Sequence, residues 1–372
     1  SAKFAAIPDN QGRDNPAAHA LVALIDKAKA DMRLFFNAPK GQFFVGESGT
    51  ELLFRLIRTA IVGTGAGRVL GSTLEHPASR SAAAHWAEVA GKPHILVAHD
   101  DTTGTVGPEA YRPEITPDTR VATILHTSPV TGMGVDVGAI AAEIRKIAPD
   151  CIIIVDGIQH AAHGRLDIES YDVDGYVISP YKVFSRHGYG VAWVSDRLHA
   201  IKHEHLIDAP GNPWEFGTRD TGAYVTFSDV VDYFVWLGGE VSDQTDPRAR
   251  IVAAGEAIHA HEKHLTDAMI NGIGNIKGLK DMAEVDIIGG LENPAREGLV
   301  CLTVKGQAAP DIVTKLRERG IRTHTRKADH YSGNVLSPLG LDAAVRVSMC
   351  HYNTETEVAQ FLTAMREIVE GV

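Results

Sequence analysis

Apolar and polar positions in the first part of the chain follow two different periods. Short continuous apolar runs indicate buried strands, and they cover residues 43–45, 68–71, 94–98, 120–126, 151–155, 176–178 and 190–195. Between these runs apolar side chains recur with helical spacing, over residues 16–36, from a turn at 46–50 to about 61, over 77–90 and over 137–147. Strands that alternate with helices predict an α/β fold with a mostly parallel sheet and right-handed crossovers. The short turn before residues 190–195 predicts that this strand is antiparallel.

The pattern changes in the last third of the chain. From about residue 248 a long helix leads away, and it is followed by predicted strands at 299–304, 321–325 and 344–349 and by helices at 311–319 and 354–369. This order predicts a smaller α+β domain. We therefore expect a large domain over residues 1–247 and a small one over residues 248–372, with the N-terminal segment as a candidate to complete the small domain.

Composition excludes several classes of protein. The formal net charge of -11 over 372 residues argues against nucleic acid or an anionic membrane as the main partner. No apolar run is long enough to span a membrane and no signal peptide is visible, so a cytoplasmic protein is expected. The cysteines are too few and too scattered for a disulfide framework or a zinc site. They are Cys151 and Cys301, which lie in strand-like runs and are expected to be buried, and Cys350.

Two chemically active side chains follow neighbouring predicted strands. Asp156 ends the apolar run 151–155, and Lys182 comes shortly after the run 176–178 in the sequence Ser-Pro-Tyr-Lys. An Asp and a Lys at the ends of adjacent strands suit pyridoxal phosphate (PLP). The lysine holds the aldehyde as a Schiff base, and the aspartate keeps the pyridine nitrogen protonated so that the ring accepts electrons.

Two further segments fit the same cofactor but also have simpler explanations. Ser48, Gly49 and Thr50 stand between a strand and a helix, where free backbone N–H groups suit a phosphate, although Ser and Thr also cap helices without binding anything. His76 follows the strand at 68–71 and could stack on a flat ring, although a surface histidine is the favoured interpretation without further context.

Three other positions keep two interpretations each. Gln159 could reach the oxygen of the cofactor ring, or it could be an ordinary polar residue at the start of a helix. His160 and His163 have a spacing that suits a metal, but no third ligand is evident, so a metal site is not expected. Arg346 lies in a strand-like segment and suits a substrate carboxylate, or it faces solvent.

Taken in order, these segments resemble the fold-type I PLP enzymes and, within them, the class V aminotransferase group that includes cysteine desulfurases. The resemblance runs from about residue 15 to 369. It implies a seven-stranded type of sheet in the large domain, a phosphate turn at Ser48-Gly49-Thr50, and a His76 that stacks on the pyridine ring. It also implies that Asp156 contacts the ring nitrogen and Gln159 the ring oxygen.

The resemblance assigns roles in the second half of the site as well. Ser179 is implied to contact the phosphate, and Lys182 to be the Schiff-base lysine. Thr218, in Glu-Phe-Gly-Thr, matches a residue that reaches the phosphate of the partner subunit's cofactor, which implies a homodimer with a shared active site. Arg346 matches the residue that holds the substrate α-carboxylate.

Four departures from the pattern bear on the reaction. Residues 326–341 contain no cysteine, and Tyr331 or Ser332 stands near the position of the mobile-loop cysteine of desulfurases, so a persulfide mechanism is not expected. Ser128, within Thr-Ser-Pro, stands near the desulfurase asparagine and is similar to the isopenicillin N epimerase-like and C–S lyase branch, which makes it a candidate cofactor ligand. Tyr181 replaces a histidine before the lysine, in a position to contact the cofactor. The N-terminal segment that closes over the substrate is not recognisable.

The sequence thus predicts a PLP-dependent enzyme that acts on an α-amino acid or an amino-acid conjugate. Lys182 is expected to act as general base and acid at Cα. β-Elimination, for example C–S cleavage, is the first choice, with transamination and epimerisation as alternatives that the same residues would serve. A PLP-binding regulator would need a basic DNA-binding segment, which is missing from the sequence, and an inactive relic would be expected to lose Lys182 or Asp156.

Overall fold

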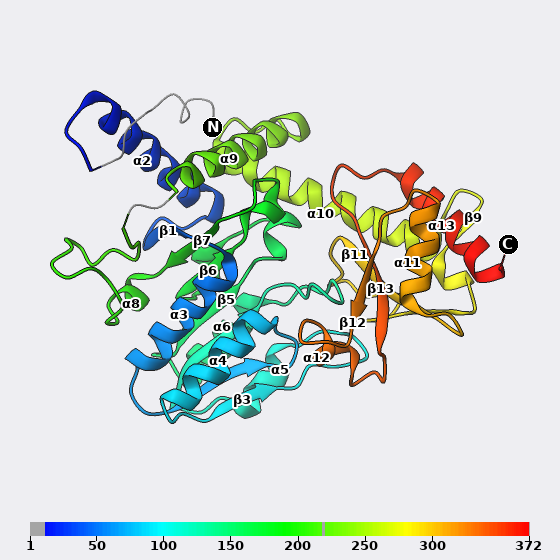
Figure 1. Cartoon of the computed structure of the whole chain (residues 1–372), viewed down its shortest axis with the longest axis horizontal. Helices are drawn as coiled ribbons and strands as arrows, with labels where there is room; N and C mark the ends of the chain where they lie inside the picture. The colour runs from blue at the N-terminus through cyan, green and yellow to red at the C-terminus, as the bar shows by residue number, and fades with distance from the viewer. Residues whose placement is uncertain (1–11, 218–219, 372) are drawn as a thin grey trace.

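A seven-stranded sheet forms the centre of the larger part of the molecule (Figure 1). The computed structural model describes residues 12–217 and 220–371. The strand order is β1-β7-β6-β5-β4-β2-β3, and β7 runs antiparallel to both of its neighbours while the other pairs are parallel. This confirms the mostly parallel sheet and its one reversed strand. The strands are β1 (Gln42–Gly46), β2 (Arg68–Ser72), β3 (His94–Val97), β4 (Thr119–Leu125), β5 (Ile152–Asp156), β6 (Gly175–Ile178) and β7 (Gly190–Val194).

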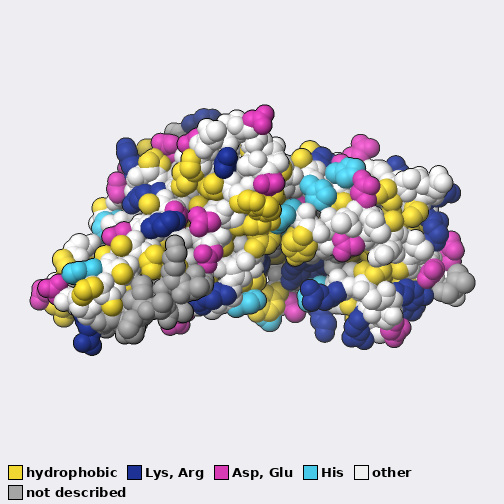
Figure 2. All heavy atoms as spheres, turned by 90° about the horizontal axis from the view of Figure 1, so that it is seen from above, with side chains coloured by type: hydrophobic (Ala, Val, Ile, Leu, Met, Phe, Trp, Pro, Cys, Tyr) yellow, Lys and Arg dark blue, Asp and Glu magenta, His cyan; other side chains and the backbone are white. Residues whose placement is uncertain are grey.

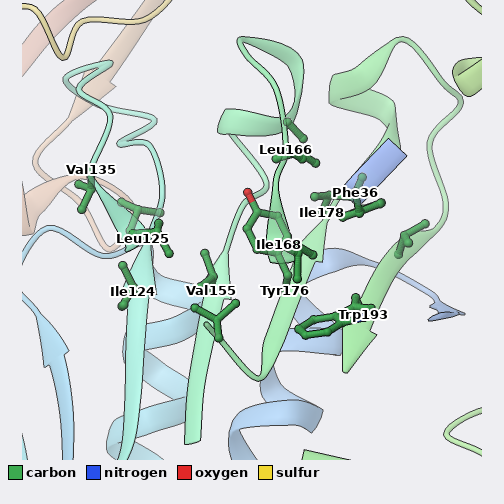
Figure 3. Packing of buried hydrophobic residues seen from close by; sticks show 14 of the residues in the cluster. Phe36, Ile124, Leu125, Val135, Val155, Leu166, Ile168, Tyr176, Ile178 and Trp193 are labelled. Carbon is green, nitrogen blue, oxygen red and sulfur yellow. The ribbon is translucent and has the colours of Figure 1, made fainter. Parts of the chain in front are cut away.

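Helices cover both faces of this sheet because successive strand residues point to opposite sides. Ile154 of β5 packs into the apolar cluster of α3 (Gly49–Gly63) and α4 (Pro77–Val89). Its neighbour Val155 points the other way, into the cluster that holds Tyr176 and Trp193 (Figure 3). The helices on that second face are α2 (Pro16–Phe36), α6 (Val137–Ile147), α9 (Gly222–Val241) and the first half of α10 (Pro247–Asn271).

Short helices fill the connections between the strands. They are α5 (Pro108–Tyr111), η1 (Arg112–Glu114), η2 (His160–Ala162), α7 (Ile168–Tyr171), η3 (Pro180–Val183) and α8 (Asp196–His199). Two of them follow strands of the parallel part directly, η2 after β5 and η3 after β6, and both lie at the carboxyl edge of the sheet. They therefore place their side chains where ligands bind in open α/β folds.

A smaller antiparallel sheet of order β10-β11-β13-β12 lies at the far end of α10 (Figure 1). Val300, Leu302 and Val345 pack against its helices, whereas Cys301 and Ala344 belong to the core cluster of the larger sheet. The elements of this region are β8 (Gly272–Ile273), β9 (Ile276–Lys277), η4 (Leu279–Asp281), β10 (Val285–Ile287), β11 (Leu299–Val304), α11 (Ala309–Glu318), β12 (His324–Lys327), α12 (Gly333–Leu336), β13 (Ala343–Ser348) and α13 (Glu355–Glu370).

Two sequence predictions differ from the observed elements. Helix α9 was not anticipated, because apolar residues fill most of its positions and its exposed face carries the apolar Trp236 beside Asp229 and Asp232. The strand expected at residues 321–325 begins later, where His324 first pairs with Arg346. The division near residues 247 and 248 stays a prediction. Within the described ranges, no helix is both long and apolar enough to cross a membrane.

Candidate active site

A pocket with a volume of about 150 Å³ opens at the carboxyl ends of β2, β4, β5 and β6. Its position matches the edge at which α/β sheets bind ligands. Each strand contributes the residues that directly follow it, so segments that are distant in sequence meet here. The lining residues are Ser48, Gly49, Thr50, His76, Leu125, Thr127, Pro129, Asp156, Ile158, Gln159, Ser179, Tyr181 and Lys182.

The N-terminus of α3 forms one wall of the pocket. Ser48 caps this helix, since its Oγ accepts a hydrogen bond from the N–H of Glu51 at 3.1 Å. A Cβ at Gly49 would lie 2.4 Å from Ser179 Oγ, so only glycine allows this hydroxyl to lie so close to the start of α3. A Cβ at Gly190, at the start of β7, would come within 2.6 Å of the Ser48 carbonyl carbon. Two glycines therefore let the helix end approach the pocket, where its N–H groups suit an anion.

Asp156 ends β5 and Lys182 follows the neighbouring strand β6, so both line the same pocket, and burial changes the pKa of both. Burial raises the pKa of Asp156 to about 6, although the N–H of Ile158 bonds to its Oδ1 at 3.1 Å and Lys182 lies nearby. Burial lowers the pKa of Lys182 to about 8, against the attraction of Asp156 and with the repulsion of Arg346 and Arg326. Near pH 8 roughly half of the lysine amines are thus unprotonated and nucleophilic.

A chain of hydrogen bonds leads from the lysine to the long helix α10. Lys182 Nζ donates to Gln159 Oε1 at 3.0 Å, and Gln159 Nε2 lies 2.8 Å from His163 Nε2. His163 Nδ1 in turn lies 2.7 Å from a carboxylate oxygen of Glu262, whose side chain is 2% exposed. Because a carboxylate accepts from Nδ1–H, His163 Nε2 is the acceptor for the Gln159 amide. The pair therefore fixes the amide so that its oxygen faces Lys182.

We expect His163→Leu to lower the free energy of unfolding by about 3 kcal/mol, because the substitution leaves the Glu262 carboxylate buried without its partner. Urea denaturation of the cofactor-free protein measures this loss. The double variant with Glu262→Leu should be more stable than His163→Leu alone. The matched control is His264→Leu on α10, the helix that also carries Glu262. His264 pairs with Glu355 at the surface, and both side chains are more than half exposed. Equal losses for the two histidines would contradict this account.

His76 stands at the start of α4 with its ring in the pocket. Its Nδ1 accepts from the N–H of Ala78 at 3.1 Å, which orients the ring. Burial, together with the charges of Lys182 and Arg326, lowers the pKa of His76 to about 4, so the imidazole is neutral at neutral pH. Its ring centre lies 6.0 Å from that of Tyr331, which shortly precedes α12. A flat, neutral ring of this kind suits stacking on another ring.

Glu75 supports the loop that carries His76, a role that the sequence did not reveal. Its carboxylate accepts from the N–H of Ser72 at 2.8 Å and from the hydroxyl of Thr123 at 2.7 Å. Complete burial raises its pKa to about 7. Asn334 of α12 donates to the Glu75 carbonyl at 3.2 Å, so the small sheet's region also holds this loop. The only signal in the sequence was an acid beside a candidate histidine.

His160 and His163 bind to different carboxylates and do not share a ligand position. His160 Nδ1 lies 2.9 Å from Glu297 Oε1, and its ring stacks on that of His126 with centres 3.5 Å apart. Glu297 also accepts from the hydroxyl of Thr127, which lines the pocket. In the part of the chain that the structure describes, no three His, Cys, Asp or Glu side chains are grouped so that they could hold a metal. His163 instead links the pocket residue Gln159 to Glu262, and His160 pairs with Glu297.

The structure does not bring every candidate residue to the pocket wall. Ser128 is buried and its Oγ accepts from the N–H groups of Val130 and Thr131, so its hydroxyl faces its own loop. Arg346 lies on β13 outside the lining, although its charge acts on Lys182. Thr218 falls outside the described residues. The cofactor and substrate roles of these three residues stay predictions.

Comparison with known proteins places this site in a family. Residues 10–361 match the family described as Aminotransferase class-V. The chain belongs to the class V aminotransferase family. Enzymes of this family depend on PLP, and cysteine desulfurase-like proteins are among the relatives of this chain.

Individual class V relatives are similar over most of the chain. A probable cysteine desulfurase of Pseudomonas putida is 28% identical over 80% of this chain and 71% of its own length. The cysteine desulfurase-like protein ustD of Aspergillus flavus is 26% identical over 97% of this chain and 81% of its own length. The nonribosomal peptide synthetase-like enzyme fsqF of Aspergillus fumigatus is 27% identical over 98% of this chain. The match covers only 24% of the length of fsqF.

Solved structures confirm the class V fold. The apo cysteine desulfurase of Thermococcus onnurineus has a TM-score of 0.82 at 18% identity. The match covers 99% of this chain and 90% of that one. The cysteine desulfurase CsdA of Escherichia coli has a TM-score of 0.78 at 20% identity, over 98% of this chain and 89% of its own. At these identities the likeness concerns the fold, including the seven-stranded sheet and the small antiparallel sheet.

The residues present in this class V chain fit PLP. Gly49, against which Ser179 Oγ packs too closely to allow a Cβ, lies at a helix N-terminus suited to a phosphate. The lysine amine, the buried carboxylate and the neutral His76 ring line the same pocket. Ser179, Gly49 and Thr50 would hold the phosphate, and Asp156 would contact the ring nitrogen.

Proposed function

We propose that this chain is a PLP-dependent enzyme that acts on an α-amino acid or amino-acid conjugate, and that it catalyses β-elimination with C–S cleavage without a persulfide cysteine. The observation that carries the proposal is the presence of the Lys182 amine and the Asp156 carboxylate in one pocket with the N-terminus of α3. Family membership supports the cofactor.

Lys182, held in place by its neighbours, would transfer the proton at the substrate Cα. The bound cofactor would supply an electron sink for the electron pair that is released when a bond to the substrate Cα breaks. Lys182 would take the proton from Cα and return it, because burial has brought its pKa to about 8, close to the working range of a general base. Gln159 would hold the amine in place through its Oε1.

The cysteines support the proposal that no persulfide forms. Cys151 and Cys301 are buried, and burial raises the pKa of each thiol to about 12. Burial also raises the pKa of Cys350, which is absent from the pocket lining. A persulfide requires an exposed thiolate within reach of the substrate sulfur. These thiols lack that character, which favours direct elimination.

Transamination is the second candidate, because the matched family carries that name and the same lysine and aspartate would serve it. Epimerisation would use them too. A PLP-binding relic is disfavoured because Lys182 and Asp156 are both present and both lie in the pocket. We also propose a homodimer in which Thr218 completes the partner's cofactor site.

A panel of amino acids distinguishes these reactions. We expect the PLP-loaded protein to release pyruvate together with the sulfur-containing leaving group from a cysteine conjugate, measured in the same sample as keto acids and enantiomers. Elimination produces pyruvate and the leaving group in equal amounts. A keto acid that retains the side chain, formed only with an amino acceptor, would show transamination instead. Loss of optical activity alone would show epimerisation.

We expect replacement of all three cysteines by Ala or Ser to leave turnover within about three-fold of wild type, because no thiol takes part in the reaction. Some stability should be lost, since Cys151 and Cys301 fill the core. Steady-state rates of the folded, PLP-loaded variant measure the effect. A loss of several hundred-fold in Cys350→Ser alone would point to a persulfide at that residue and would end the elimination proposal.

A further inference from the structure

Arg326 and Arg346 lie on the same face of the small sheet. Arg346 of β13 pairs with His324 of β12, and Arg326 lies two residues further along β12. Residues directly opposite each other share a face, and so do residues two apart along a strand. Cys301 of β11 lies opposite Arg346 on its other side and therefore shares this face as well. The two guanidinium groups thus extend from neighbouring positions of one surface.

That surface faces the larger sheet and the pocket. Cys301 and Ala344 belong to the core cluster of the larger sheet, whereas Val300 and Val345 pack against the helices on the opposite side. Arg326 Nη2 donates to the carbonyl of Pro129 at 3.0 Å, and Pro129 lines the pocket. In Figure 2, Lys and Arg side chains gather on the smaller part of the molecule beside the hollow at its junction with the larger part.

Neither guanidinium has an ion-pair partner among the described residues. Arg346 Nε donates to the Ser348 hydroxyl at 2.8 Å, and Arg326 Nε is buried without a hydrogen-bond partner in the same ranges. Burial and the charge of Arg326 lower the pKa of Arg346 to about 10. Burial lowers the pKa of Arg326 more than the neighbouring Cys301, Asp329 and Tyr181 raise it. Two partly buried positive charges without counter-ions among the described residues are unfavourable, and anions would relieve that cost.

We propose that the site selects an α-amino acid whose side chain ends in a second anionic group, which Arg326 binds while Arg346 holds the α-carboxylate. This rests on the proposed function, because it requires a PLP-dependent enzyme that binds an α-amino acid, and it takes the role of Arg346 from the resemblance to class V enzymes. The guanidinium fork matches the paired oxygens of a carboxylate or a sulfinate, and one arginine for each anion satisfies both charges. A short side chain of the aspartate or cysteine sulfinate type is the class of substrate that this arrangement fits.

Arg326 could otherwise serve only to hold the loop at Pro129. The substitution Arg326→Gln separates the two roles, since glutamine keeps an N–H donor for the Pro129 carbonyl but removes the charge. Lys327→Gln is the matched control. Lys327 is exposed at the next position of β12, on the opposite face, and loses one positive charge in the same way.

The test uses the full-length, PLP-loaded protein and two measurements. Calorimetry compares the binding of maleate, a dicarboxylate, with that of propionate, a monocarboxylate, and needs no turnover. Spectral titration of the PLP-loaded protein compares the binding of L-aspartate with that of L-asparagine, and the binding of L-cysteine sulfinate with that of L-cysteine, which distinguishes a carboxylate from a sulfinate. We expect the wild type and Lys327→Gln to prefer the anionic member by about 100-fold, and Arg326→Gln to lose most of this preference. Propionate binding should be similar in all three proteins.

Two results would overturn the inference. One is a wild type that binds propionate as tightly as maleate and shows no preference within the amino-acid pairs. The other is an Arg326→Gln variant that keeps the full preference. Failure of the proposed function looks different, because the protein would then not take up PLP or would bind no α-amino acid. A PLP-loaded enzyme that favours neutral amino acids would end this inference alone.

Discussion

Lys182→Ala is expected to abolish turnover, with a loss of at least about 1000-fold, because one amine both anchors the cofactor and moves the Cα proton. The variant should also lose the yellow absorbance of lysine-bound PLP, which gives a readout that does not depend on any substrate. Folding should be preserved, since burial already penalises the charged form of Lys182 and alanine removes that penalty. Absorbance spectra and single-turnover rates measure the two effects.

Lys202→Ala is the control for this substitution. Lys202 is an exposed lysine shortly after α8 and is absent from the pocket lining. Its replacement should leave both the spectrum and the rate unchanged. A Lys182→Ala variant that retained the wild-type spectrum and turned over at a comparable rate would mean that another lysine carries the cofactor.

Asp156→Asn is expected to keep PLP bound but to slow Cα proton removal by about 100- to 1000-fold, because it removes the charged partner of the ring nitrogen. Exchange of the α-proton for deuterium, followed by NMR, measures this step apart from later chemistry. A rate equal to that of wild type would show that Asp156 is not the partner of the ring nitrogen.

The stability of Asp156→Asn shows whether slower proton removal results from the lost charge or from misfolding. Folding raises the pKa of Asp156 to about 6, so its contribution to stability is present at low pH and is lost as the pH rises through that value. At neutral pH the buried carboxylate therefore opposes folding, and Asp156→Asn should not lower the urea midpoint of the cofactor-free protein. Asp150→Asn, at an exposed position just before β5, is the control and should change neither exchange nor stability.

The sequence predicted the centre of the site because its geometry follows from local patterns. Asp156 and Lys182 each follow an apolar run, and the carboxyl ends of parallel strands meet at one edge, so their proximity needed no tertiary information. The same argument places Ser48, Gly49 and His76, which also stand where a strand passes into a helix.

The remaining parts of the site depend on contacts that no local pattern reveals. Glu262 meets His163 across a long sequence separation, and the spacing along α10 does not show which of its charged residues faces inward. Ser128 has a suitable side chain, but the turn that follows it uses its hydroxyl. Arg326 lies where the predicted strand was misplaced, so its shared face with Arg346 became evident only from the pairing of β12 and β13.

The most direct test of the account is to locate the covalent attachment of the cofactor. The protein is incubated with PLP, reduced with borohydride, digested and mapped by mass spectrometry. We expect the pyridoxyl group on the peptide that contains Lys182, at one group per chain. Attachment at Lys202 or another lysine, or no attachment in a folded protein, would contradict the account.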